Sequence, residues 1–206
     1  MHFPSVKKHR TTMLQKMEHK KGRLRMIKFR TIALIAAASS MAVAAFAALE
    51  SGLKPGAAPG AFQVVDVTGP HKGSQLCYRC QYGAAPVVAA FVNGDVSKAD
   101  KLVTDLQKIV DAHKAQGLKS FIVFMSGPET KDAIQKLAAE KKTTIPLVFL
   151  PKGTKEEDIA AYKINPKVEN TVLIWKGMDV KGNFVDMDAA GAKTADVQKA
   201  VDTMLK

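Results

Sequence analysis

The stretch Pro86-Val-Val-Ala-Ala-Phe-Val92 is a continuous run of apolar residues. It lacks the alternation of apolar and polar residues that a half-exposed strand shows, so it predicts a strand buried on both faces. Asn93-Gly94-Asp95 places turn residues directly behind the run. Because a strand covered on both faces needs a layer of structure on each side, the run predicts an α/β architecture.

Strand and helix patterns alternate on both sides of this run. Apolar residues recur at the spacing of one helical face in 97–116 and again in 128–142. The other predicted elements are strands at 62–67, 121–125, 145–150, 171–175 and 182–186, a short helix near 155–162, and a last helix capped by Thr194. Two strand–helix units followed by a hairpin and a terminal helix predict an α/β sandwich with a mixed sheet.

Several segments carry a family pattern. Leu53–Phe62 places a proline a few residues before a phenylalanine, Val65–Gly73 has the composition of a hairpin, and Asp158–Ile164 that of a short helix before a later strand. With the buried run at 86–92 and the closing hairpin, these segments resemble the thioredoxin-like superfamily, in its peroxiredoxin-like and TlpA-like branch. The resemblance covers about residues 53–205. It implies a mixed sheet flanked by helices, with an N-terminal β-hairpin extension.

The active-site residues of that family do not carry over. Its CxxC motif follows the central strand, where this chain has Asn93–Ser97 and no cysteine. The peroxiredoxin pattern P-x-x-x-T-x-x-C is absent as well. Many relatives place a cis-proline before the strand that corresponds to 171–175, where this chain has Glu169-Asn170. The proline of Ile145-Pro146 falls one strand too early.

A different CxxC, Cys77-Tyr-Arg-Cys80, holds the two cysteines of the chain. It precedes the buried strand, so it lies at the opposite end of that strand from the usual family site. As a redox pair, Cys77 would attack and Cys80 would resolve, by analogy with other CxxC motifs. The positive groups Arg79 and His71 would favour the thiolate. No helix is expected here to help them.

Two other interpretations of the cysteines stay open. A static disulfide would close a loop of about four residues and contribute only about 2 kcal/mol. Alternatively, CxxC is half of a zinc site, which His71 and His113 would complete. His113 is also explained as a histidine at the C-terminal end of a helix, where it interacts with the helix dipole. Tyr78 and Tyr82 beside the cysteines form either turn packing or a contact surface.

The net charge of +12 is concentrated at the N-terminus. Residues 1–30 carry ten basic side chains and one acidic side chain, whereas 48–206 carry a net charge of only +3. An uncharged apolar segment, 31–47, follows the basic block and ends in Ala45-Phe46-Ala47. This pattern predicts a secretory signal peptide cleaved after Ala47, with the true start at Met26 or Met17.

The sequence therefore predicts a leader and signal peptide at 1–47, an extended lead-in at 48–60 and a thioredoxin-like domain at 61–206. We expect an extracytoplasmic protein that contacts a membrane only through an uncleaved signal and binds no nucleic acid. No motif for a cofactor is present. The two functional hypotheses are thiol–disulfide exchange with protein thiols or disulfides, and a non-catalytic domain that binds an unknown protein partner and whose disulfide is structural.

Overall fold

The computed structural model describes residues 49–152, 156–187 and 192–206. The predicted basic leader and apolar signal segment lie outside these ranges. Within the described ranges, no helix has both the length and the hydropathy needed to span a membrane.

The elements follow the predicted alternation. Along the chain they are β1 (Val64–Asp66), β2 (Gln75–Leu76), α2 (Tyr78–Tyr82), β3 (Pro86–Val92), η1 (Val96–Ala99), α3 (Asp100–Ala112), η2 (Lys114–Gln116), β4 (Lys119–Phe124), η3 (Pro128–Thr130), α4 (Lys131–Lys141), β5 (Leu147–Phe149), α5 (Glu156–Ala160), β6 (Asn170–Lys176), β7 (Asp179–Val185) and α6 (Ala192–Leu205). The run 86–92 is a strand with the predicted bounds. The predicted cap of the last helix is wrong, because Thr194 lies inside α6 and its hydroxyl donates to Asp105 Oδ2 at 3.0 Å.

The strands form a seven-stranded mixed sheet in the order β2-β1-β5-β4-β3-β6-β7. β3 lies in the interior of the sheet, next to the central strand β4; it is parallel to β4 and antiparallel to β6, so that Ala89 is opposite Phe121 on one side and Leu173 on the other. The hairpin of β1 and β2 joins the edge through antiparallel pairing of β1 with β5. The predicted mixed α/β sheet with an N-terminal hairpin is confirmed.

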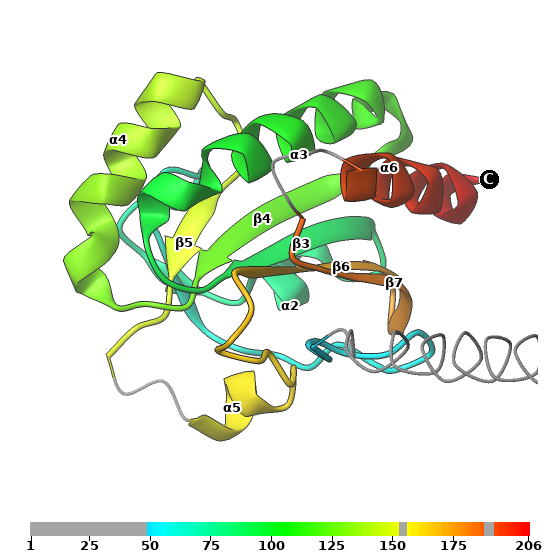
Figure 1. Cartoon of the computed structure of the whole chain (residues 1–206), viewed down its shortest axis with the longest axis horizontal. Coiled ribbons are helices and arrows are strands. Elements are labelled where there is room, and N and C mark those ends of the chain that lie inside the picture. Colours follow the sequence, from blue (N-terminus) through cyan, green and yellow to red (C-terminus); the bar gives the residue numbers. More distant parts are fainter. Residues whose placement is uncertain (1–48, 153–155, 188–191) are drawn as a thin grey trace, which may run out of the picture. The chain divides into compact units, whose positions relative to one another are not determined.

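Two layers cover the sheet (Figure 1). α3, α4 and α6 lie on one face, whereas α2, α5 and the lead-in lie on the other. β3 contributes alternate side chains to both layers: Val88 belongs to the first hydrophobic cluster and Phe91 to the second. Since every residue of β3 after Pro86 is at most 4% exposed, the continuous apolar run is explained by burial on both faces.

Aromatic rings connect the second layer to the sheet. Phe62 lies edge-on to Tyr162 at a centroid distance of 4.9 Å. Tyr78 of α2 stacks on Phe121 at 5.5 Å, and Phe121 meets Trp175 edge-on at 6.1 Å. Helix α2, which is only five residues long, is thereby anchored to the core of the sheet.

The lead-in has neither helix nor strand in its described residues but is held by specific contacts. The Ser51 hydroxyl hydrogen-bonds the Thr171 hydroxyl at 2.6 Å, and both residues are buried. The Gly52 N–H donates to Lys163 O at 2.9 Å. The side-chain amide of Asn183 on β7 donates to Ser51 O at 2.7 Å. These bonds fix the lead-in against β6 and β7.

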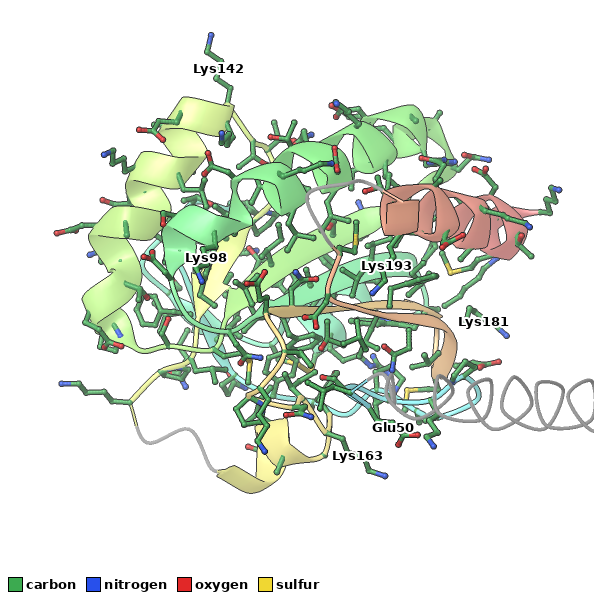
Figure 2. All side chains as sticks on the ribbon, viewed as in Figure 1. Glu50, Lys98, Lys142, Lys163, Lys181 and Lys193 are labelled. Carbon is green, nitrogen blue, oxygen red and sulfur yellow. A yellow bond between two sulfur atoms is a disulfide. The ribbon has the colours of Figure 1, made fainter. Side chains whose placement is uncertain are left out.

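Lysines are spread over the surface. Figure 2 shows the side chains of Lys142 at the end of α4, Lys181 on β7 and Lys163 beyond α5 pointing outward in different directions. Acidic side chains nearly balance the basic ones in 48–206, which leaves the net charge of +3.

His113 caps the C-terminal end of α3 and links that helix to α6. Its Nδ1 donates to Ile109 O at 2.8 Å, and its Nε2 hydrogen-bonds Asp202 Oδ1 at 2.7 Å. The hydrogen bonds from His113 and from Gln198 lower the pKa of the Asp202 carboxyl below its ordinary value. The hydrogen bond between His113 and Asp202 therefore stabilises the folded state when the Asp202 carboxyl is ionised.

This pair makes stability depend on acidity. A carboxyl with a lowered pKa in the folded state stabilises above its unfolded pKa of about 4, and the stabilisation is lost as the pH falls through the folded value. Asp202→Asn is expected to unfold at a lower temperature than the wild type at pH 6–7, with the difference shrinking below about pH 4. Thermal melts at several pH values measure this. A difference that stays constant down to acid pH would contradict the assignment.

Candidate functional site

The two cysteines lie at the start of a short helix. Cys77 precedes α2 in extended conformation, and its sulfur accepts a hydrogen bond from the Cys80 N–H at 3.0 Å. Gly83 ends the helix with φ 55°, a positive φ that glycine adopts without strain. The expectation that no helix begins at the cysteines is wrong. The signal in the sequence was Gly83, which follows the helix directly.

The cysteines form a disulfide, with a distance of 2.12 Å between the sulfurs. Their surroundings differ: Cys77 is only 9% exposed, whereas Cys80 is exposed. α2 directly precedes β3, and the Tyr82 hydroxyl donates to Ser120 O near the start of the parallel strand β4 at 3.2 Å. The pair thus lies at the amino ends of the central parallel strands, as the sequence predicts.

Tyr78 anchors the helix from inside. It is 1% exposed, and its hydroxyl donates to Asp66 Oδ2 at 2.7 Å. Burial, reinforced by this hydrogen bond, raises the pKa of the Tyr78 phenol above its usual range. The phenol therefore stays protonated and acts as a donor to Asp66. Of the two interpretations of Tyr78, packing is confirmed.

Asp66 organises the loop beside the helix. Its buried carboxylate also accepts hydrogen bonds from the backbone N–H groups of Gly69 at 2.7 Å, His71 at 2.8 Å and Thr68 at 3.2 Å. A side chain at Gly69 would meet the Tyr78 hydroxyl at 2.6 Å and Asp66 Oδ2 at 2.8 Å, so only glycine lets the loop approach this closely. One carboxylate therefore ties the β1–β2 hairpin to the residue that follows Cys77.

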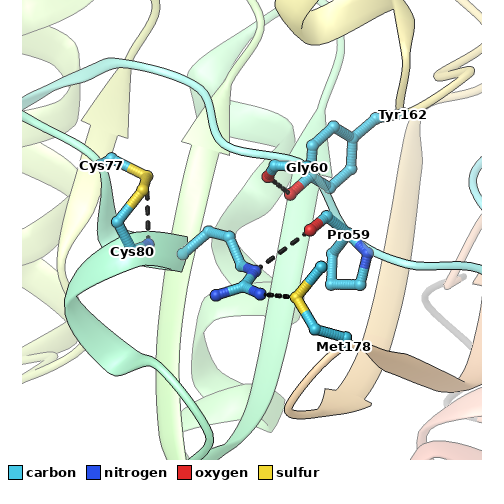
Figure 3. Close-up of a disulfide and its surroundings, with 7 residues drawn as sticks. Pro59, Gly60, Cys77, Cys80, Tyr162 and Met178 are labelled. Atoms are coloured by element: carbon cyan, nitrogen blue, oxygen red, sulfur yellow. Dashed lines mark hydrogen bonds between the residues drawn. A yellow bond between two sulfur atoms is a disulfide. The ribbon is translucent and has the colours of Figure 1, made fainter.

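The Arg79 side chain bonds to the lead-in and to the turn between β6 and β7; Figure 3 shows these contacts as the dashed lines that reach Pro59 and Met178. Its Nε donates to Pro59 O at 3.1 Å, and its Nη2 contacts Met178 Sδ in the turn between β6 and β7. Nearby, the Tyr162 hydroxyl donates to Gly60 O at 2.6 Å. Among the described contacts, none joins the guanidinium to either sulfur. The structure therefore does not support the predicted stabilisation of a thiolate by Arg79; instead, this side chain holds α2 to the lead-in.

The two remaining residues of α2 are held as well. The Gln81 side-chain amide donates to His71 Nε2 at 2.6 Å, which ties the helix to the hairpin loop. Tyr82 is half-buried, and burial raises the pKa of its phenol. Its ring lies 5.2 Å from that of Tyr78. Apart from Cys80, each residue of α2 is thus bound through its side chain to another part of the domain.

The proposed zinc ligands do not come together. His113 faces Asp202 on the layer of α3 and α6, whereas α2 lies on the opposite face of the sheet. Within the described residues, no group of three or more His, Cys, Asp or Glu side chains is placed to hold a metal ion. The zinc hypothesis for Cys77, Cys80, His71 and His113 is therefore not supported. The other explanation for His113, a histidine at a helix end, matches its position.

A structural loop occupies the usual family position at the other end of β3. The Asn93 side chain donates to Asn165 O at 3.0 Å and Val168 O at 2.9 Å. Asp95 caps η1 by accepting from the Ser97 N–H at 2.9 Å. The peptide bonds of the described residues, including that before Pro146, are trans. At this end of the sheet the side chains of Asn93 and Asp95 hold the loops in place. Neither side chain has redox chemistry.

Solved structures of low sequence identity share this fold. One is the thioredoxin domain of a thiol-disulfide oxidoreductase from Bacteroides vulgatus: it is 16% identical with a TM-score of 0.59, covering 75% of this chain and 99% of that one. The chain has a thioredoxin-like fold. A putative thiol:disulfide interchange protein DsbE from Chlorobium tepidum is similar at 17% identity and a TM-score of 0.59, with the same coverage.

The thioredoxin-like fold also matches peroxidoxin BcpB from Mycobacterium tuberculosis at 15% identity and a TM-score of 0.56, over 74% of this chain and 98% of that one. No protein-family model and no curated protein matches the sequence. At these identities the likeness establishes the fold, and the function has to be argued from the cysteine site itself.

Asp66 was not predicted as part of this site. A signal was present, because a carboxylate interrupts the apolar residues of 64–67 just before Thr68-Gly69. Aspartate at such a position commonly accepts hydrogen bonds from the backbone of the following turn. Its bond to Tyr78 could not be inferred from spacing alone.

Proposed function

We propose that this thioredoxin-like domain carries out thiol–disulfide exchange with protein thiols and disulfides through Cys77 and Cys80. The observation that carries the proposal is that the exposed end of the disulfide, Cys80, sits on a helix that other contacts hold in place. A disulfide that exchanges must be reachable by a thiolate and must open without unfolding the domain. Exposure of Cys80 meets the first requirement.

The anchors of α2 support the second requirement. Tyr78 bonds to Asp66, Arg79 to Pro59 and Tyr82 to Ser120. Because these bonds do not involve the sulfurs, the helix retains them when the disulfide opens. The disulfide closes a loop of about four residues, for which the loss of chain entropy corresponds to only about 2 kcal/mol.

Reduction is therefore expected to lower the free energy of unfolding by about 2 kcal/mol while leaving the domain folded. Urea unfolding of the oxidised and the reduced protein, followed by the fluorescence of the buried Trp175, measures both quantities. The Cys77→Ser/Cys80→Ser variant serves as a control that cannot reoxidise. A reduced protein that is unfolded in buffer would contradict the proposal.

The second candidate is a non-catalytic binding domain with a structural disulfide. The observation that favours it is the absence of cysteine from Asn93–Ser97, the family position. This candidate predicts that glutathione does not open the disulfide in the folded protein. Incubating the folded protein with reduced glutathione and counting its free thiols separates the two candidates, because exchange requires that the disulfide opens.

The proposal includes export of the protein. Its support is the basic block ahead of the apolar segment 31–47, together with the persistence of disulfides in oxidising compartments. Ser51 bonds to Thr171 and Glu50 O accepts from the Asn165 side chain, so cleavage after Ala47 would remove none of the contacts described above. The intact mass of protein recovered from a bacterial periplasm tests this: a chain that begins at Ala48 is expected, and one that retains residues 1–47 would contradict it.

A further inference from the structure

The exposure of the two cysteines is opposite to the order that the CxxC analogy predicts. Cys80 is exposed, whereas Cys77 is 9% exposed and lies directly before the fully buried Tyr78. A thiolate attacks a disulfide along the line of its two sulfurs and needs access to the sulfur that it attacks. The accessible residue of this pair is the second cysteine.

The hydrogen bonding also distinguishes the cysteines. The Cys80 backbone N–H donates to Cys77 Sγ at 3.0 Å. A backbone donor aimed at a sulfur stabilises negative charge on it. A sulfur whose thiolate is better stabilised leaves faster in exchange. Cys77 is therefore the better leaving group, and Cys80 is the better point of attack.

We propose that Cys80, not Cys77, forms the mixed disulfide with the substrate. This inference rests on the proposed thiol–disulfide exchange. A substrate thiolate attacks Cys80 Sγ, the bond between the two cysteines breaks, and its electron pair leaves on Cys77 Sγ. A second substrate thiolate then attacks the substrate sulfur and releases Cys80 as a thiolate. The substrate becomes a disulfide, two electrons pass to the protein, and the protons of the substrate thiols pass to solvent or to the cysteines.

The reverse reaction uses the same roles. The Cys80 thiolate attacks a substrate disulfide, and one substrate sulfur leaves as a thiolate. Cys77 then attacks Cys80 Sγ, restores the internal disulfide and releases the second substrate thiolate. Cys80 thus bonds to the substrate in both directions, whereas Cys77 is the leaving group in the first and the resolving cysteine in the second.

The sequence allows a direct test in the wild-type protein, with reduced glutathione as the probe. The oxidised protein is mixed with glutathione, quenched in acid after short times, and its free thiols are blocked with N-ethylmaleimide. Trypsin cleaves after Arg79, which separates peptide 73–79 with Cys77 from peptide 80–98 with Cys80. Mass spectrometry of the two peptides then locates the glutathione.

A severalfold excess of glutathione on peptide 80–98, with N-ethylmaleimide on Cys77, is the expected result. Glutathione found equally on both peptides, or mainly on Cys77, would overturn the assignment of roles while leaving the proposed exchange function intact. A disulfide that glutathione does not open in the folded protein would overturn the exchange function and this inference with it.

Single variants provide a second readout. Cys77→Ser retains Cys80, and serine is a favourable residue at a helix N-cap, so the helix is expected to form. With oxidised glutathione, Cys77→Ser is expected to form a mixed disulfide severalfold faster than Cys80→Ser does. The opposite order of rates in two variants that both remain folded would overturn the inference.

Discussion

Asp66→Ala is expected to lower the free energy of unfolding by roughly 3–5 kcal/mol. The buried carboxylate accepts the Tyr78 hydroxyl and three backbone N–H groups, and hydrogen bonds to a charged group contribute about 1.5–3 kcal/mol each without being additive. Alanine leaves these donors without their acceptor. Urea unfolding monitored by Trp175 fluorescence gives the value.

Tyr78→Phe is the matched control for this prediction. It removes only the hydroxyl that donates to Asp66 and keeps the ring stacked on Phe121. We expect it to cost about 1–3 kcal/mol, less than Asp66→Ala. If Asp66→Ala destabilised by under about 1 kcal/mol, the carboxylate would not organise this region as described.

Cys80→Ser is expected to reduce catalysed disulfide exchange to the uncatalysed rate. The substitution removes the exposed sulfur and also the internal disulfide, while the side-chain anchors of α2 remain. Reduction of insulin by dithiothreitol, followed as turbidity, measures the exchange.

Lys72→Ser is a suitable control for this loss of activity. Lys72 is an exposed residue in the neighbouring loop between β1 and β2, and its substitution leaves the disulfide in place. It should retain the wild-type rate. Undiminished exchange by a folded Cys80→Ser protein would show that the activity does not come from this cysteine pair.

The fold could be predicted from the sequence because burial leaves a clear pattern. The run 86–92 has no polar side chain, and the structure places it in the interior of the sheet between two layers. The patterns of strands and helices around it were sufficient to indicate a mixed α/β sheet. Such patterns reflect many residues at once, so small errors at element ends, as at Thr194, do not change the architecture.

The candidate site was predicted less completely. The cysteines and their end of the sheet could be inferred from their position before β3. The direction of the Arg79 side chain could not, because it depends on Pro59 and Met178, which are distant in the sequence. The zinc hypothesis failed for the same reason: spacing did not show that His113 faces Asp202 on the other layer.

The order of exposure of the cysteines is also a property of three-dimensional packing. Analogy with other CxxC motifs favours the first cysteine as the reactive one, but here that cysteine precedes Tyr78, whose burial draws the start of α2 inward. The second cysteine lies one turn later on an exposed position. A motif of the same spacing can therefore present either sulfur, depending on which neighbouring side chain is buried.

The reduction potential of the Cys77–Cys80 pair tests the exchange function most directly. The purified protein is equilibrated with mixtures of reduced and oxidised glutathione, and its thiols are trapped and counted by mass. We predict a potential between about −120 and −270 mV, the range of known exchange proteins. A potential below about −300 mV, typical of disulfides that only stabilise a fold, would contradict the account.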